Sequence, residues 1–392
     1  MEFRLSDQTL AFSVDVARAT MGVDALYRRE TGFTDLHDGL VVLNMANVEP
    51  AAYESYQAAQ SHLAELAQKA LALPEPDRRL YYAQACTSLW SFCQWRQDQL
   101  PSMSSQIGLF LHADPAPASQ AALDVYSGEL YRMLGEAGYA GSLKQRIDAW
   151  EQKNLVPADE VQGTMDEMMV EARRRTGEIL PLPEGDYYRC ETVSGGPFNA
   201  SSDYGNRRVI INTDPILTTQ KLKHLVCHEV YPGHFMQFTL RRQAWEQGVG
   251  GLDGTLSVCN HSSSCTFEGI ADCGIRFLDW EEGIDDRISG LVSVIQSALG
   301  TAASYQMHTL GWENAQVEDF LRKNAPGGGE GWVNNRMGFI SDPARAALIS
   351  SYWRGDEGVF PVWERVEKAD RPRFFTYIYN RLHTIQSMQL FR

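Results

Sequence analysis

The sequence lacks a membrane-spanning run of apolar residues, because no stretch approaches about 18 residues without a polar interruption. Its amino terminus also lacks the basic start and apolar core of a secretory signal. We therefore expect a cytoplasmic protein.

Runs of basic residues are missing as well. Asp and Glu number 50 against 35 Lys and Arg, so the formal net charge is −15 and the pI is near 5.1. Proteins that bind nucleic acid or anionic membranes cluster positive charge to neutralise phosphates. The composition therefore indicates that nucleic acid is not a partner, and the missing apolar run indicates the same for a membrane.

A disulfide framework is not indicated either. The seven cysteines are an odd number, are widely spaced and form no CxxC pair. We expect free thiols, most of them small buried apolar residues.

What the chain does have is helical periodicity. Apolar residues recur at three- and four-residue spacing, which predicts helices over residues 53–72, 118–134, 161–175 and 220–230. A β-branched run predicts a strand over 207–213, next to the last of these helices. The expected fold is therefore mainly α, with a small β element.

Irregular segments suggest how the chain is divided. The glycine-rich stretches 248–254 and 325–331 are expected to be loops. A proline-rich stretch near residue 180 suggests a helical N-terminal lobe over 1–180 and a second lobe over 181–392, packed as one compact unit. All the candidate chemistry lies in the second lobe.

The stretch from His228 to His234, HEVYPGH, contains residue types that bind and use zinc. Zinc enzymes need imidazoles or carboxylates that converge on one point, and a nearby carboxylate to take a proton from water. These histidines are six residues apart, which is about 240° on a regular helix, so they can share an ion only if the helix breaks between them. Pro232-Gly233 supplies such a break, because proline removes a backbone donor and glycine accepts unusual dihedral angles.

Other interpretations of these residues stay open. Pro232-Gly233 can also simply end one helix and leave His234 as an ordinary polar residue. Glu268, on a second expected helix, is a candidate third ligand but is also typical of a surface glutamate. Two further pairs have four-residue ligand spacing but no adjacent carboxylate and helix break: His224 with His228, and His261 with Cys265.

The segment HEVYPGHFMQ, residues 228–237, resembles the signature of the bacterial domain-of-unknown-function-885 family, which is regarded as a family of zinc metallopeptidases. The resemblance extends over residues 155–355 and implies a zincin-like metallopeptidase architecture. It also implies roles for six residues: His228, His234 and Glu268 as zinc ligands, Glu229 as general base, His308 facing the substrate, and Tyr352 stabilising the oxyanion.

The chemistry of the residues is compatible with these roles. Glu229 can accept a proton from the attacking water, and a neutral His or Tyr can donate to developing negative charge. Three further residues are candidates for binding substrate, with the arginines holding a carboxylate as a fork: Arg336, Arg345 and Asn212.

The chain also departs from the family pattern. Family members usually carry an Arg and an Asp upstream of the histidine that matches His308, whereas Gly300 and Ser304 stand at these offsets here. The wall that faces the substrate is therefore expected to differ.

We expect a zinc-dependent hydrolase that acts on a small peptide or amide, with metal-activated water and Glu229 as general base. Zinc is the expected ion, although another divalent transition metal also suits these ligands. One alternative is a diverged metalloenzyme that performs a lyase or isomerase step on a small amino-acid-like metabolite. A weaker alternative is a non-catalytic binding protein.

Overall fold

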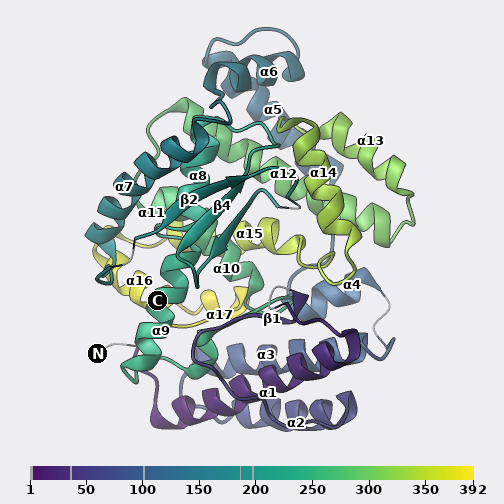
Figure 1. Ribbon diagram of the computed structural model, residues 1–392, viewed down its shortest axis with the longest axis vertical. Coiled ribbons are helices and arrows are strands. Elements are labelled where there is room, and N and C mark those ends of the chain that lie inside the picture. Colours follow the sequence, from purple (N-terminus) through teal and green to yellow (C-terminus); the bar gives the residue numbers. More distant parts are fainter. Residues whose placement is uncertain (1–2, 36–37, 100–101, 186, 197) are drawn as a thin grey trace. The chain divides into compact units, whose positions relative to one another are not determined.

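The computed structural model describes residues 3–35, 38–99, 102–185, 187–196 and 198–392. It is mainly helical, as expected, and contains two small sheets (Figure 1). Within these residues, no helix is both long and apolar enough to cross a membrane.

The elements predicted from periodicity are present. The four helices are found as α2 (Tyr56–Ala70), α5 (Gln120–Glu136), α7 (Val161–Ile179) and α8 (Thr219–Glu229), and the strand as β4 (Arg208–Asn212). The glycine-rich segments were less well predicted. Helix α14 (Gly329–Ser341) begins inside the expected loop 325–331, and a 3-10 turn, η3 (Leu252–Thr255), begins inside the other.

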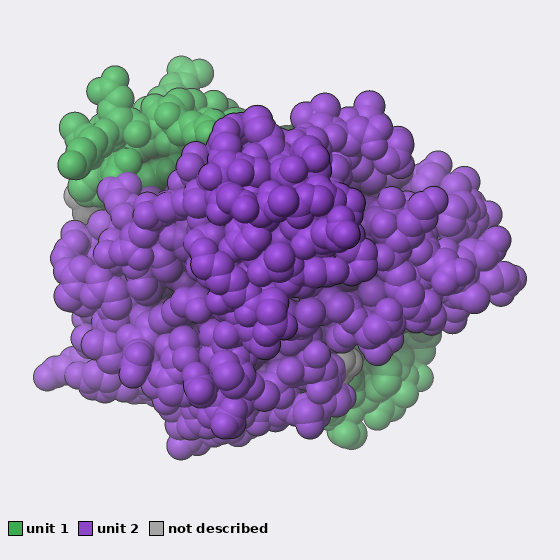
Figure 2. All heavy atoms as spheres, turned by 90° about the horizontal axis from the view of Figure 1, so that it is seen from above, with its two compact units in different colours: residues 1–115, 236–270, 354–392 green, residues 116–235, 271–353 purple. Residues whose placement is uncertain are grey.

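The chain forms two compact units, each assembled from separate segments (Figure 2). Unit 1 contains residues 1–115, 236–270 and 354–392, and unit 2 contains residues 116–235 and 271–353. The boundary expected near residue 180 therefore falls inside unit 2. A change in composition marks an irregular segment, whereas packing between distant segments decides which of them share a core.

Three long helices dominate unit 1: α1 (Asp7–Thr31), α2 and α3 (Pro76–Trp95) pack against one another. Ser6 caps α1 by accepting a hydrogen bond from the backbone N–H of Thr9 at 3.2 Å, and Gly32 ends it in the left-handed conformation. Strands β1 (Val41–Asn44) and β5 (Leu256–Val258) pair antiparallel. The smaller elements of this unit are α4 (Met103–Gln106), η2 (Ile107–Leu111), η3, η4 (Lys368–Asp370), α16 (Arg371–Tyr379) and α17 (Ile385–Met388).

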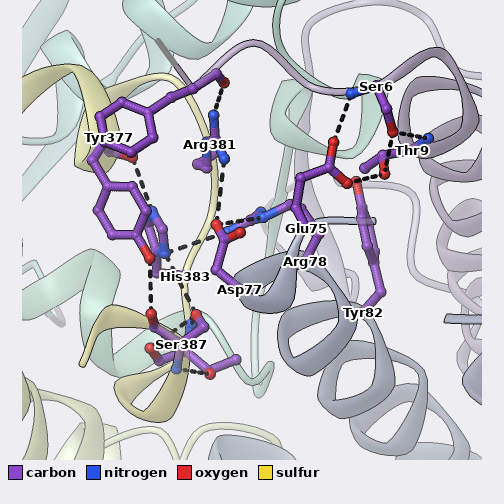
Figure 3. Close-up of polar contacts among 12 residues, drawn as sticks. Ser6, Thr9, Glu75, Asp77, Arg78, Tyr82, Tyr377, Arg381, His383 and Ser387 are labelled. Atoms are coloured by element: carbon purple, nitrogen blue, oxygen red, sulfur yellow. Dashed lines mark hydrogen bonds and ion pairs between the residues drawn. The ribbon is translucent and has the colours of Figure 1, made fainter. Parts of the chain in front are cut away.

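Unit 1 also contains a buried ionic network (Figure 3). The carboxylate of Asp77 accepts hydrogen bonds from Arg78 at 3.0 Å and from Arg381 at 3.3 Å. Arg78 also donates to Nδ1 of His383 at 3.3 Å, and Nε2 of that ring donates to the carbonyl of Tyr377 at 2.9 Å. Burial raises the pKa of Asp77, but the lowering by Arg78, His383 and Arg381 together outweighs this effect. The net pKa therefore lies well below the usual range. Asp77 is therefore the ionised partner of two buried guanidiniums.

Helix α12 (Ile284–His308) is the centre of unit 2 and packs against α5, α8, α13 (Asn314–Asn324) and α14. Its buried side chains, which recur at helical spacing, join a large apolar cluster with residues of α5, α13 and α14. The other helices that lie wholly within this unit are α6 (Leu143–Asn154), α7 and α11 (Gly274–Phe277). The chain passes between the units within α9 (His234–Glu246), α10 (Ser264–Asp272) and α15 (Ser350–Glu364).

A three-stranded sheet lies beside α8, in the order β2 (Arg189–Val193), β4, β3 (Ala200–Asp203). Strand β2 pairs parallel with β4, and β3 pairs antiparallel with it. Val209 and Ile211 of β4 are fully buried, which fits the alternation of a half-buried strand. Helix α7 packs against both β2 and α8 (Figure 1). The expected β element beside the candidate metal-binding helix is thus confirmed.

All seven cysteines are free thiols, as expected, and six of them are buried. Cys227, immediately before His228, packs against the backbone of α11. A Cβ added at Gly274 would lie only 3.0 Å from the Cβ of Cys227. Burial raises the pKa of the Cys227 thiol well above its usual range. Cys227 therefore acts as a packing residue rather than a nucleophile.

Candidate metal centre

The predicted break in the HEVYPGH stretch is present. Helix α8 ends at Glu229, and α9 begins at His234. The N–H groups of Val230 and Tyr231 both bond to the carbonyl of Val226 at 3.0 Å, which closes the last turn before the chain reverses. The rings of His228 and His234 consequently meet edge to face, with centroids 4.6 Å apart.

Gly233 makes this reversal possible. A Cβ at position 233 would lie 1.7 Å from the carbonyl oxygen of His228 and 2.5 Å from that of Cys227. Real Cβ atoms never approach so closely, so any side chain here would push the two segments apart. The absence of a side chain therefore allows His234 to return to the end of α8.

The two histidines are brought together with the third predicted ligand. One ligand atom from each of His228, His234 and Glu268 lies within 4.8 Å of the other two. Both histidines are buried, with 7% and 8% of their surfaces exposed. Two imidazoles and one carboxylate are a common ligand set for catalytic zinc, which keeps a further position open for water.

Asp272, which the sequence analysis did not single out, orients His228. It follows Glu268 by one turn of α10, so both carboxylates lie on one face of that helix. Nδ1 of His228 donates to the Asp272 carboxylate at 2.7 Å, and Nε2 of His224 lies 3.3 Å from the same oxygen. With Nδ1 protonated in this way, Nε2 carries the lone pair that a metal ligand needs.

The charge of Asp272 follows from these contacts. Burial raises the pKa of its carboxyl, but His228 and His224 lower it more, so the net pKa lies far below the usual range. Burial lowers the pKa of His224 to about 4, so that ring is neutral at pH 7. A carboxylate, a histidine and a metal in series are the usual arrangement for zinc ligands.

The group His224, His228 and Asp272 is itself a second possible ligand set, again within 4.8 Å. On the sequence, the His224–His228 pair lacks an adjacent carboxylate combined with a helix break. The tertiary structure nevertheless places Asp272, from α10, beside both rings. A metal held there through Nδ1 of His228 would have to displace the existing 2.7 Å hydrogen bond.

Replacing Asp272 with asparagine is expected to weaken zinc binding by about 10- to 100-fold, because an amide accepts the Nδ1 hydrogen bond less strongly and makes His228 less basic. Competition with a fluorescent chelator measures this affinity. Asp319→Asn, which changes a carboxylate that is 82% exposed, serves as the control. Unchanged affinity in Asp272→Asn would show that this carboxylate does not act through His228.

Glu229, the expected general base, lies at the end of α8 and is only 7% exposed. Among the described residues, no group forms a hydrogen bond or ion pair with its carboxylate. The buried hydroxyl of Tyr188 lies within electrostatic reach, and burial raises the pKa of this tyrosine well above its usual range. Glu229 is therefore a buried carboxylate next to a candidate ligand, with its proton-accepting oxygens uncommitted.

His308 and Tyr352 have structural neighbours of their own. Nε2 of His308, at the end of α12, bonds to the backbone carbonyl of Ile340 at 2.7 Å. Tyr352, on α15, packs edge-on against Phe339 with ring centroids 6.4 Å apart and lies within electrostatic reach of Arg336. Their substrate-facing roles stay predictions, and for His308 only Nδ1 remains to meet a ligand.

The three candidate substrate-binding residues differ in how far their side chains are already engaged by other groups of the protein. The amide group of Asn212 donates to the carbonyl of Gly196 at 2.9 Å and accepts from the N–H of Asp214 at 3.1 Å, which braces the end of β4. Arg345 is 40% exposed and lies 3.6 Å from Asp342, as expected of a surface pair. Arg336 is partly buried and has no such acidic partner among the described residues.

Gly300 and Ser304, where the sequence departs from the family pattern, take part in the packing of α12. A Cβ at Gly300 would lie 3.2 Å from Cδ of Arg336 and 3.2 Å from Cγ1 of Ile349. The hydroxyl of Ser304 donates to the carbonyl of Ala346 at 3.1 Å. The glycine therefore leaves the space in which the arginine lies.

Two residues missed by the sequence analysis, Asp272 and Lys221, have simple local signals. Asp272 is four residues after Glu268, and Lys221 is seven residues before His228, so each shares a helix face with a predicted ligand. Helical spacing therefore places both near candidate ligands, although it does not show which side chains they contact.

Comparisons with known proteins reveal a likeness of fold. No family model matches the chain, and no curated protein matches it. The structure is similar to that of a protein named as a lipoprotein from Colwellia psychrerythraea, with a TM-score of 0.56 and 14% identity over 85% of this chain and 68% of the other. It is also similar to that of a protein named as a lipoprotein of unknown function from Shewanella oneidensis, with a TM-score of 0.50 and 14% identity over 85% of this chain and 70% of the other. At this identity the likeness extends to the fold alone.

Proposed function

We propose that the protein is a zinc-dependent hydrolase that acts on a small peptide or amide, with His228, His234 and Glu268 as metal ligands. The observation that carries this proposal is the ligand group itself, in which the three ligand atoms lie within 4.8 Å of one another. The donor set suits zinc because it combines two neutral imidazoles with one carboxylate.

The hydrogen bond from His228 to Asp272 favours this ligand group over the one that contains His224. It fixes the ring so that Nε2, not Nδ1, serves as the donor to a metal. Glu268 then completes the set from the same face of α10 that carries Asp272.

Zinc bound at these residues would supply a Lewis acid that polarises the scissile carbonyl. Glu229 accepts a proton from the attacking water and passes it to the leaving amine, a role that its uncommitted carboxylate permits. A neutral donor then stabilises the oxyanion, and Tyr352, His308 through Nδ1, and the buried Tyr188 are the candidates.

A zincin-like architecture is part of the proposal, because the broken α8–α9 pair beside a small sheet would place the ligands as metallopeptidases do. The resemblance to the domain-of-unknown-function-885 family supports the same assignment. We retain the cytoplasm as the proposed location, a compartment in which free thiols such as the seven of this chain stay reduced.

The test is the metal content of the purified protein, measured by plasma mass spectrometry beside His228→Ala and Glu268→Ala. We expect about one zinc per chain in the wild type and its loss in both variants, because removal of one of three ligands leaves an incomplete site. Glu167→Ala, an exposed change on α7, is the control and should retain zinc. Wild-type protein that takes up no zinc would overturn the proposal.

A second candidate reaction is a lyase or isomerase step on a small amino-acid-like metabolite. The arrangement at Gly300 favours it, because the nearby Arg336 could hold the carboxylate of such a metabolite. Reaction in heavy-oxygen water separates the two candidates. Hydrolysis places solvent oxygen in a product carboxyl group, whereas an unlabelled product would exclude it.

A further inference from the structure

Two cations of unit 2, Lys221 and Arg336, lie partly buried without an ion-pair partner among the described residues. Lys221 lies on the face of α8 that carries His224 and His228. Arg336 lies on α14, with its guanidinium 5.5 Å from the centroid of the Trp332 ring. Its buried Nε has no hydrogen-bond partner within the described part of the chain.

Lys223, two residues further along α8, shows how the same helix satisfies a structural lysine. Its ammonium donates to the carbonyl of Trp280 at 3.1 Å and pairs with Glu282 at 3.1 Å and Asp286 at 2.8 Å. Lys221 has no comparable set of acceptors. Its burial is therefore not explained by contacts within the protein.

The nearby acids do not neutralise the positive charge of Lys221 and Arg336. Burial lowers the pKa of the Lys221 ammonium. The carboxylates of Asp272 and Glu229 raise this pKa, whereas the like charge of Arg336 lowers it. Asp272 already bonds to two histidines. Burial also lowers the pKa of Arg336. Cations held away from water in proteins are normally paired, so two partly buried, unpaired ones within electrostatic reach of each other indicate a binding partner from outside the chain.

A cavity of about 40 Å³ lies beside Lys221. Lys221 lines it, and so does Trp332, the ring on which Arg336 stacks. Gln296, Ser293 and Glu151 add polar groups to the wall. The carboxyl of Glu151 accepts a hydrogen bond from the N–H of Gly328 at 2.7 Å, and burial raises its pKa to about 7. The volume suits one small polar group rather than a whole substrate.

We propose that Lys221 and Arg336 form a subsite for a carboxylate group of the ligand. A guanidinium matches the two oxygens of a carboxylate with two parallel hydrogen bonds, and the ammonium supplies a further donor. A carboxylate fits better than a phosphoryl group, because Asp272 and Glu229 already offset part of the positive charge and the cavity is small. We take the bound carboxylate to be part of the substrate, which rests on the proposed function. The subsite then restricts the substrates to amides or metabolites that carry a free carboxylate.

Isothermal titration calorimetry on zinc-treated protein tests the subsite with N-acetylglycine, its uncharged analogue N-acetylglycinamide, and inorganic phosphate. We expect N-acetylglycine to bind at least tenfold more tightly than the amide and more tightly than phosphate. Lys221→Met and Arg336→Met should each weaken binding of N-acetylglycine by about 10- to 100-fold, in line with the loss of a charge-assisted hydrogen bond. Arg322→Met, which removes a surface arginine paired with Glu330, should leave binding unchanged.

Thermal unfolding of the unliganded variants separates a binding role from a structural one. Replacing an unpaired buried cation with methionine should raise the melting temperature, by about 2 °C or more for Arg336→Met. A lowered melting temperature would mean that Arg336 has a structural partner and would overturn the proposal, as would equal binding of acid and amide or tighter binding of phosphate. Zinc content measured on the same samples keeps the two proposals apart. Protein without zinc refutes the metalloenzyme, whereas unchanged affinity for N-acetylglycine in both Met variants refutes the subsite.

Discussion

Glu229→Gln is expected to bind zinc as the wild type does but to hydrolyse its amide about 10²- to 10⁴-fold more slowly, because the isosteric amide cannot accept the proton of the attacking water. The side chain is buried at the end of α8 and forms no hydrogen bond within the described part of the chain. The substitution therefore removes proton transfer without breaking a contact that holds the ligands.

The measurement is kcat on whichever small amide the wild type cleaves, with zinc content determined on the same preparation. His228→Ala should lose both metal and activity, and Glu167→Gln, an exposed change on α7, should lose neither. Activity within a factor of ten of the wild type in zinc-loaded Glu229→Gln would exclude Glu229 as the base. Loss of zinc in this variant would instead make it a ligand.

The second large effect is expected in unit 1, where Asp77→Ala should lower the free energy of unfolding by about 3–5 kcal/mol, because it leaves two buried guanidiniums without their shared carboxylate. Arg78 and Arg381 are 1% and 5% exposed, so water cannot replace the lost partner. Urea denaturation measures the change. Asp15→Ala, an exposed position on α1, should shift it by about 0.5 kcal/mol or less. A loss below about 1 kcal/mol in Asp77→Ala would show that the network contributes little.

The same network predicts a pH dependence. The pKa of Asp77 is lower in the folded protein than in the unfolded chain. Its contribution to stability is therefore complete above the unfolded pKa, near 4, and is lost as the pH falls below it. Between pH 7 and pH 3, Asp77→Ala should consequently lose less stability than the wild type.

Much of the fold could be predicted from the sequence. Apolar periodicity gave four helices in nearly their observed positions, and a β-branched run gave β4. The break at Pro232-Gly233 was predictable too, since it follows from the backbone chemistry of these two residues. The glycine-rich segment at 325–331 was less predictable, because packing allowed α14 to begin at Gly329.

The partners of the candidate ligands were not predictable in this way. Asp272 lies 44 residues from His228 in the chain, and no local pattern states that their side chains meet at 2.7 Å. Nor does the sequence show that Lys223 is paired while Lys221 is not, although both lie on one short helix.

The sequence by itself determined the helical character of the chain, the ligand types in HEVYPGH and the break between the two histidines. These depend on neighbouring residues, through helical spacing and the dihedral limits of proline and glycine. The tertiary structure alone decided which segments form each unit and that His234 returns to His228. It also decided that Asp272 orients the His228 ring and that Lys221 and Arg336 form no ion pair with an acidic side chain of the described residues. These depend on contacts through space, where burial and the nearest charged group determine what each side chain can do.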